Sequence, residues 1–130
     1  MRIPEKLLAT VHESLHAKSV AQAFRQALRK RQRRQSLVHH SDRGIQYFSA
    51  LYQSLHARHG KCSMTDGYDC YQNALAERIY GILKTELLLS SPENLEQARK
   101  MVAEAVQIYN TERPHMALKN KTPDAVHRAF

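Results

Sequence analysis

LVHHSDRGIQY, residues 37–47, joins a short apolar run to an acid and a turn. The run predicts a buried strand, and Asp-Arg-Gly is a typical turn sequence that ends this strand at Asp42. In α/β proteins functional groups gather at the carboxyl ends of strands, where a carboxylate can hold Mg²⁺ or Mn²⁺. Asp42 is therefore a candidate metal ligand, and a plain turn-forming role is the alternative.

A second acid, Glu77, lies in a stretch with helical periodicity. The apolar residues of this stretch recur at three- and four-residue steps: Leu75, Ile79, Ile82, Leu83 and Leu87. Glu77 and Lys84 fall on another face of the predicted helix, which makes Lys84 a candidate phosphate contact. The alternative for Glu77 is an exposed helix residue that pairs with Arg78 or Lys84.

Asp42 and Glu77 together suggest metal-dependent phosphoryl transfer. They are separated by 34 residues, and a strand-end Asp and a helical Glu can converge on one divalent metal. In two-metal enzymes the ions lie about 3.5–4 Å apart, activate water or a DNA 3′-OH and stabilise the leaving oxygen. Such a site needs a third carboxylate, and no Asp precedes position 42. The chain therefore carries two thirds of the expected site.

The remaining elements are predicted from apolar spacing, caps and breakers. They are an amphipathic helix from Ser19 to about Arg33, a helix capped by Ser49 and ended by Gly60, a short strand at 61–65, a loop at 66–72, a helix with Ser91 as N-cap and Pro92 at its first position that ends near Asn110, and a last helix from Thr122-Pro123 to Phe130. Residues 1–16 show no clear pattern. The length of 130 residues fits one domain or a piece of one.

Composition narrows the class of protein. No apolar run approaches the roughly 18–20 residues of a membrane helix, and the N-terminus has no signal-peptide stretch. We therefore expect a cytosolic protein with no membrane partner. Cys62 and Cys70 form neither a disulfide framework nor a CxxC site and are expected to be free thiols. A zinc site at His56, His59 and Cys62 is a weaker alternative, because a structural site needs four ligands.

The net charge is +8, and the excess is concentrated in one basic block. Six of the ten residues from position 25 to position 34 are basic and none is acidic: Arg25, Arg29, Lys30, Arg31, Arg33 and Arg34. Such a block attracts polyanions, of which nucleic acid is the expected one. A solvated helix end is the alternative, and a basic run alone says nothing about sequence recognition.

Several motifs follow one another in a single order. HSDRGxQY, which contains Asp42, is followed by Ser63-Met64-Thr65, by Asn73-Ala-x-Ala-Glu77 with Leu83-Lys84-Thr85-Glu86, by Tyr109-Asn110-x-x-Arg113-Pro114-His115, and by Thr122-Pro123. From about Leu37 to Pro123 this series closely resembles the integrase core of bacterial insertion-sequence transposases of the orfB type, which are related to retroviral integrases.

The resemblance implies an α/β, helix-rich, RNase H-like fold. It also implies cleavage and transfer of DNA strands by a triad of two Asp and one Glu that binds Mg²⁺ or Mn²⁺. Asp42 matches the second Asp of the triad and Glu77 matches the Glu, so both are expected to bind metal and to act in catalysis. Arg43, Lys84 and the basic block are expected to contact DNA.

The chain departs from the family pattern in two places. The first Asp would lie on a three-strand meander ahead of Ser19, and the 18 residues before Ser19 are too few for three strands. The spacing from Asp42 to Glu77 is one residue shorter than usual, and a one-residue shift in a strand reverses which side chains face the core. We therefore expect an incomplete fold without the meander, with 1–18 as an unassigned remnant and 19–130 as a partial catalytic core from a truncated or decayed gene.

Three roles remain open on these grounds. The first is a transposase core that is inactive alone, so the chain's own enzymatic activity is unsettled. The second is a basic fragment that binds DNA without chemistry. The third is a fragment that associates with itself or docks on an intact transposase. The expected location is the bacterial cytoplasm, in association with nucleoid DNA.

Overall fold

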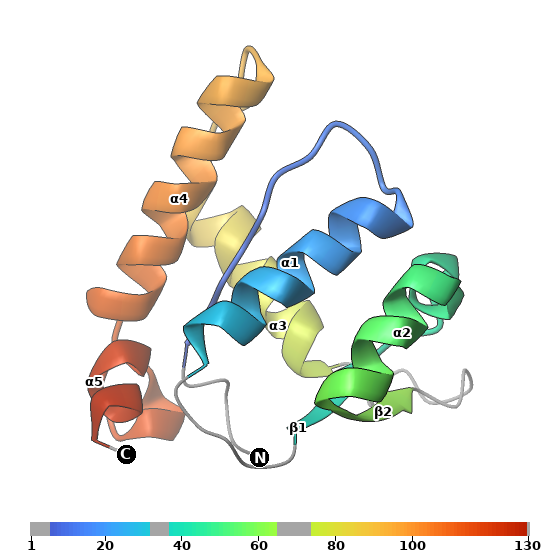
Figure 1. The fold of residues 1–130 in the computed structure, drawn as a ribbon. Coiled ribbons are helices and arrows are strands. Elements are labelled where there is room, and N and C mark those ends of the chain that lie inside the picture. Colours follow the sequence, from blue (N-terminus) through green and yellow to red (C-terminus); the bar gives the residue numbers. More distant parts are fainter. Residues whose placement is uncertain (1–5, 32–36, 65–73, 130) are drawn as a thin grey trace. The chain divides into compact units, whose positions relative to one another are not determined.

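A computed structural model describes residues 6–31, 37–64 and 74–129 (Figure 1). The chain divides into two compact units. One unit comprises His12–Glu77, and the other combines Met1–Val11 with Arg78–Phe130.

The unit of residues 12–77 contains a two-stranded parallel sheet. Its elements are, in order, helix α1 (Ala17–Lys30), strand β1 (Leu37–Ser41), the 3₁₀ turn η1 (Ile45–Phe48), helix α2 (Ala50–His59) and strand β2 (Gly60–Met64). The first pair in the ladder is Leu37 with Gly60, and the last is Ser41 with Met64. Because both strands run in the same direction, α2 is the crossover that returns the chain to the start of the sheet. Both predicted strands are present, and β2 begins at Gly60, one residue before the predicted start. The expected burial of β1 is wrong, because its residues alternate between half-buried and exposed as far as His40, and Val38 is 61% exposed.

Helices α1 and α2 close the core of this unit. The buried residues Ala21, Phe24, Tyr52 and Leu55 pack together, and Val20, Leu28, Leu37 and Tyr47 pack around them. The predicted apolar stripe of α1 is therefore the face that meets the core. The helix runs from Ala17 to Lys30, whereas the sequence suggested Ser19 to about Arg33. Arg33 lies outside the described residues.

The boundaries of α2 follow local chemistry. Ser49 is its N-cap, as predicted, and the Ser49 hydroxyl accepts a hydrogen bond from the Tyr52 N–H at 3.3 Å. The helix ends at His59, and the chain enters β2 at Gly60. The predicted loop at 66–72 lies outside the described residues.

The division between the two units falls within helix α3 (Ala74–Ile82), directly after Glu77. In the second unit, α3 continues into a π-helical turn, η3 (Leu83–Leu87). Helix α4 (Leu95–Thr111), the 3₁₀ turn η4 (Met116–Leu118) and helix α5 (Pro123–Arg128) follow, with α5 packed near the C-terminal end of α4 (Figure 1). The last helix starts at Thr122-Pro123, as predicted: Thr122 caps α5 by accepting a hydrogen bond from the Ala125 N–H, and Pro123 is its first residue. The helix ends at Arg128, two residues before the predicted end.

The predicted start of α4 at Ser91 and Pro92 is wrong, because a stronger cap lies further along. The Asn94 side chain accepts a hydrogen bond from the Gln97 N–H at 2.8 Å, and the Gln97 side chain accepts one from the Glu93 N–H. These two bonds satisfy backbone donors that a helix start leaves open. The helix therefore begins at Leu95, after the Asn-x-x-Gln pair.

The described residues form a helix-rich α/β fold with two strands. Residues 7–16, ahead of α1, form neither helix nor strand. The expectation of a helix-rich α/β architecture is confirmed. No helix in the described ranges is long and apolar enough to cross a membrane.

Gly60→Ala tests whether β1 and β2 need a glycine at their first pair. A Cβ on residue 60 would lie 2.0 Å from the Leu37 carbonyl oxygen, so the strands would have to separate. We expect a loss of about 1–3 kcal/mol in the free energy of unfolding. Gly81→Ala is the matched control, because a Cβ there meets no atom within 4 Å and alanine favours a helix by about 1 kcal/mol. Equal urea midpoints for the two variants would contradict the close approach.

Candidate functional site

Asp42 directly follows β1 and closes a tight turn. Its Oδ1 accepts a hydrogen bond from the Gly44 N–H at 2.9 Å. A Cβ on residue 44 would lie only 3.1 Å from the same oxygen, so the small residue lets the turn close. The turn-forming role of Asp42 is confirmed. The same bond orients a carboxylate that is exposed at the end of the strand.

The residues after this turn fix it to the rest of the unit. The Gln46 Nε2 donates to the Leu15 carbonyl at 3.0 Å, and the Tyr47 N–H donates to the Gly44 carbonyl at 2.9 Å. The Tyr47 ring packs edge-to-face on the buried ring of Tyr52, with centroids 5.1 Å apart. The Gln and Tyr of HSDRGxQY therefore support the turn from which Asp42 projects.

His39 belongs to the core of the same unit. Its ring lies edge-to-face on Phe24 at 4.9 Å and 4.8 Å from the ring of His56, and its Nε2 shares a 3.0 Å hydrogen bond with the Tyr52 hydroxyl. Burial lowers the pKa of His39 to about 4, with further lowering by nearby His56 and His40. His39 is therefore neutral near pH 7, and its ring packs among the aromatic side chains of this unit.

His40 and His56 have structural contacts as well. On β1, the exposed His40 shares a 3.1 Å hydrogen bond between its Nδ1 and the Ser63 hydroxyl on β2, which ties two of the motifs together. His56 is buried against Phe24, and burial lowers its pKa. Among the residues that the structure describes, no group of three or more His, Cys, Asp or Glu could hold a metal ion. The zinc alternative therefore finds no support there, although Cys70 lies outside the described residues.

Glu77 lies in the first turn of α3 and is exposed. The helix buries Ile79 and Ile82, so the predicted apolar stripe is confirmed and Glu77 lies off it. A carboxylate near the start of a helix is also favoured by the helix dipole. Asp42 and Glu77 belong to the same compact unit, and each is a hard-oxygen ligand of the kind that Mg²⁺ prefers.

The helix that carries Glu77 changes its winding at Leu83. The Leu88 N–H donates to the Leu83 carbonyl at 2.7 Å, which closes a π-helical turn with a wider circumference than an α-helical one. The Thr85 hydroxyl bonds back to the Gly81 carbonyl at 2.8 Å. Lys84 is exposed within this turn. The prediction that Lys84 shares a face with Glu77 assumed α-helical winding over seven residues, and that winding ends at Ile82.

The π-helical turn places Glu86 against the motif that follows α4. Arg113 donates from Nε to Glu86 Oε2 at 2.7 Å and from Nη2 to Oε1 at 2.8 Å, which is a bidentate pair. Donation by Arg113 lowers the pKa of the Glu86 carboxyl, and the same bond raises the pKa of the Arg113 guanidinium. Sequence reasoning named both residues as motif members and missed their contact, which joins positions 27 apart.

His115 and Tyr109 complete this second cluster. The ring of the buried His115 lies edge-to-face on the buried Tyr109 at 4.7 Å, and its Nδ1 lies 3.3 Å from Arg113 Nη1. Burial lowers the pKa of His115, with Arg113 adding to the effect. The neutral ring accepts more readily from the guanidinium than an imidazolium would. Tyr109, Arg113 and His115 therefore position one another and the end of the helix that carries Glu77.

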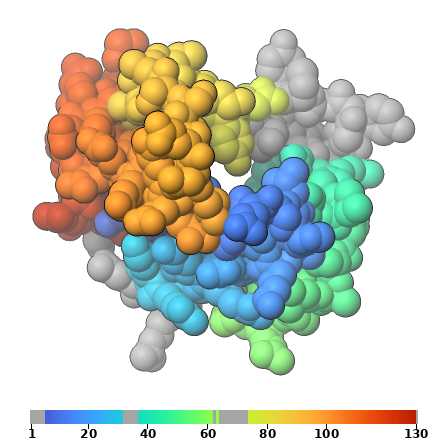
Figure 2. Space-filling model, turned by 90° about the horizontal axis from the view of Figure 1, so that it is seen from above, coloured from blue at the N-terminus to red at the C-terminus, as the bar shows by residue number. Residues whose placement is uncertain are grey.

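Of the residues that are predicted to contact DNA, some are exposed, one is half-buried and some lie outside the described residues. Arg29 and Lys30 are exposed in the last turn of α1, which lies at the surface in Figure 2 (light blue), and Arg43 is exposed beside Asp42. Arg31 follows the helix and is half-buried. Arg33 and Arg34 lie outside the described residues.

Comparison with known proteins adds a family and a fold. The family described as Integrase core domain matches residues 58–123, a stretch that includes Glu77 and Arg113. An uncharacterized 31 kDa protein of insertion element IS600 from Shigella sonnei is 34% identical over 121 residues, covering 91% of this chain and 44% of its own length. A match of that length must contain Asp42 as well. The putative transposase InsK of IS150 from Escherichia coli K12 is 36% identical over 100 residues, covering 75% of this chain and 35% of its own.

The fold comparison agrees with these sequence matches. The catalytic core domain of BIV integrase superposes with a TM-score of 0.74 and 19% identity, covering 97% of this chain and 80% of that one. The architecture is therefore integrase core-like. The chain spans less than half the length of the two curated relatives, so what a whole relative does is a separate question.

The low pKa of His39 predicts an acid-sensitive core. Below its ordinary pKa of 6.5 the unfolded chain binds a proton at His39, whereas the folded chain does so only near pH 4. The contribution to stability is therefore complete above pH 6.5 and is lost as the pH falls toward 4. Between pH 6.5 and 4, His39→Gln should reduce the slope of the free energy of unfolding, measured with urea, against pH. The reduction should correspond to less than one bound proton, because the ring is only half-buried. An unchanged slope, matching the exposed control His59→Gln, would refute it.

Proposed function

Because the chain belongs to the integrase core domain family, which it shares with insertion-element transposases, we propose that it is the Asp42–Glu77 part of a DNA strand-transfer site. The observation that supports this most strongly is positional. The family match covers Glu77, which is exposed at the start of a helix, and the longer match to the Shigella protein also takes in Asp42. The neighbours of Asp42 build a turn that leaves its carboxylate exposed and therefore accessible to a ligand.

The two carboxylates suit a hard divalent cation. Mg²⁺ and Mn²⁺ are bound in phosphoryl-transfer sites by one or two carboxylates together with water and substrate phosphate oxygens. We propose Asp42 and Glu77 as the protein ligands. A bound ion would supply stabilisation of charge on the phosphate oxygens and activation of an attacking hydroxyl. The hydrogen bond from the Gly44 N–H would hold the Asp42 carboxylate in one orientation for this task.

The third carboxylate of the family triad has no counterpart in this sequence. No Asp precedes Asp42, and the segment of residues 7–16 forms no strand to carry one. We therefore propose that this 130-residue chain does not transfer strands alone. The exposed Arg29 and Lys30 favour a second role, in which the chain binds DNA without chemistry of its own.

DNA would be held by exposed cations. Arg43 adjoins Asp42, and Lys84 is exposed in the turn that continues the Glu77 helix, and we propose each as a phosphate contact. Arg29 and Lys30 lie at the C-terminal end of α1, and the basic block continues through Arg31, Arg33 and Arg34. Phosphate contacts of this kind give affinity without sequence readout.

A strand-transfer assay tests the incomplete triad. The purified chain with Mg²⁺ should give no joined product, while a hybrid carrying the part of the Escherichia coli relative that precedes its matched stretch should give product from that element's ends. Glu77→Gln in the hybrid should abolish the product, and Glu96→Gln, an exposed acid on α4, should not. Robust transfer by the chain alone that Asp42→Ala abolishes would disprove the proposed inactivity.

Salt dependence tests the basic block. Binding to duplex DNA should weaken steeply with salt, because each neutralised phosphate contributes about 0.9 to the slope of log K against log salt. Replacing both Arg29 and Lys30 with Gln should reduce that slope by up to about 2. Arg99→Gln, an exposed site on α4, is the control. An unchanged slope in the double variant would remove these residues from the interface.

A further inference from the structure

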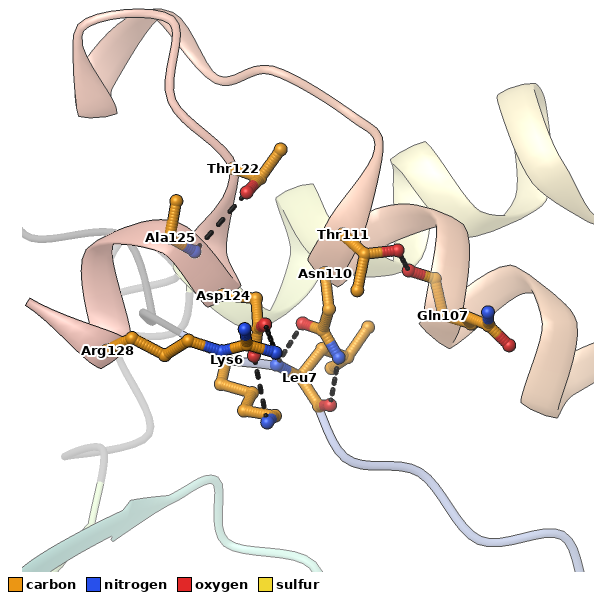
Figure 3. Close-up of polar contacts among 9 residues, drawn as sticks. All are labelled: Lys6, Leu7, Gln107, Asn110, Thr111, Thr122, Asp124, Ala125 and Arg128. Atoms are coloured by element: carbon orange, nitrogen blue, oxygen red, sulfur yellow. Dashed lines mark hydrogen bonds and ion pairs between the residues drawn. The ribbon is translucent and has the colours of Figure 1, made fainter.

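The corner where α4 leads to α5 holds two buried polar side chains whose partners come from far away in the chain (Figure 3). Asn110 at the end of α4 is 5% exposed, and Asp124 at the start of α5 is 7% exposed. Asn110 bonds to Leu7, 103 positions away, and Asp124 bonds to Lys6, 118 positions away. A buried amide or carboxylate without a partner is costly, and Lys6 and Leu7 supply partners to both side chains.

Asn110 recognises a backbone rather than a side chain. Its Oδ1 accepts a hydrogen bond from the Leu7 N–H at 2.8 Å, and its Nδ2 donates to the Leu7 carbonyl at 2.8 Å (Figure 3). A residue in an antiparallel ladder exchanges the same two bonds with its partner. One amide side chain thus takes the place of a neighbouring strand, and it fits any extended residue at that position.

Asp124 adds a charge requirement one residue earlier. Its Oδ1 accepts from the Lys6 ammonium at 3.0 Å, and its Oδ2 accepts from the Arg128 guanidinium at 2.6 Å. Hydrogen bonding by Lys6 holds the pKa of the Asp124 carboxyl below its usual range, so the carboxylate is charged near neutral pH. Arg128 is a largely exposed neighbour on the same helix, whereas Lys6 arrives with the segment. The corner therefore selects a cation immediately before the clamped residue.

The segment itself contributes no regular structure to this attachment. Residues 7–12 form neither helix nor strand, so side chains of α4 and α5 hold Lys6 and Leu7 without a ladder. We propose that the α4–α5 corner is a receptor for an extended peptide with a basic residue before the clamped position, and that Lys6–Leu7 of this chain occupies it as a detachable latch. This role is independent of the Asp42 and Glu77 chemistry, and it gives Asn110 of the Tyr-Asn-x-x-Arg-Pro-His motif a function of its own.

Amide hydrogen exchange in the full chain tests the clamp. The Leu7 N–H should be protected, and Asn110→Ala should speed its exchange on the order of tenfold or more, because both backbone bonds are lost. Thr111→Ala is the control, since its hydroxyl bonds to the Gln107 carbonyl of the same helix. The Glu112 N–H, bonded to Ile108, reports whether α4 stays folded. Unchanged Leu7 exchange in Asn110→Ala, with Glu112 still protected, would overturn the clamp.

A competing peptide tests whether the latch detaches. An unlabelled peptide with the sequence of residues 2–12, added in excess to the isotope-labelled chain, should displace the latch and speed Leu7 exchange to the level of Asn110→Ala. The same peptide with Lys6→Glu should have little effect, because the carboxylate of Asp124 repels it. No acceleration with saturating wild-type peptide would show a fixed structural contact and overturn the receptor. Equal acceleration by both peptides would overturn the charge requirement.

Discussion

The parallel pairing of β1 with β2 is the constraint on which the unit of residues 12–77 depends. The strands approach so closely at Leu37 and Gly60 that only a residue without a Cβ fits. This pairing sets the register of β1, and a register shifted by one residue would exchange the side chains on its two faces. With the observed register, His39 enters the aromatic core and Asp42 follows the strand into an exposed turn. A scaffold contact thereby decides where the candidate ligand lies.

Some residues of the family motifs make structural contacts, and others stay exposed and are the candidates for chemistry. Gln46 and Tyr47 support the Asp42 turn, and Glu86 is gripped by Arg113 at the end of the Glu77 helix. Asp42 and Glu77 stay exposed beside these supports. That division is expected of a catalytic site, in which ligands project from positions that neighbouring contacts hold rigid.

Sequence reasoning succeeded where the physics is local. The Ser49 cap, the helix start at Thr122-Pro123 and the strand that ends just before Asp42 depend on residues within one or two turns. The predicted start of α4 was wrong because the cap is Asn94, three residues after Ser91: its side chain accepts from the Gln97 N–H, and the Gln97 side chain accepts from the Glu93 N–H. The apolar spacing of a helix in the sequence does not reveal a π-helical turn. Here such a turn accompanies the contact between Glu86 and the distant Arg113.

Long-range contacts were the part that the sequence could not supply. The bonds from Leu7 to Asn110 and the burial of His39 against Phe24 join segments whose proximity depends on the whole fold. The resemblance to transposases located Asp42 and Glu77 without placing them in space. The order of the motifs identified the family. A metal shared by the two carboxylates requires that they lie close together, which their spacing in the sequence alone does not determine.

The central claim is that Asp42 and Glu77 share one divalent ion. Substoichiometric Mn²⁺ added to the isotope-labelled chain broadens the NMR signals of nearby amides, so it reports which residues lie around the ion. If the two carboxylates share the ion, the signals of Asp42 and Gly44 should broaden together with that of Glu77. Glu77→Gln should then relieve the broadening both at the Asp42 turn and at residue 77. Broadening confined to one of the two places, or unchanged in Glu77→Gln, would contradict a shared site.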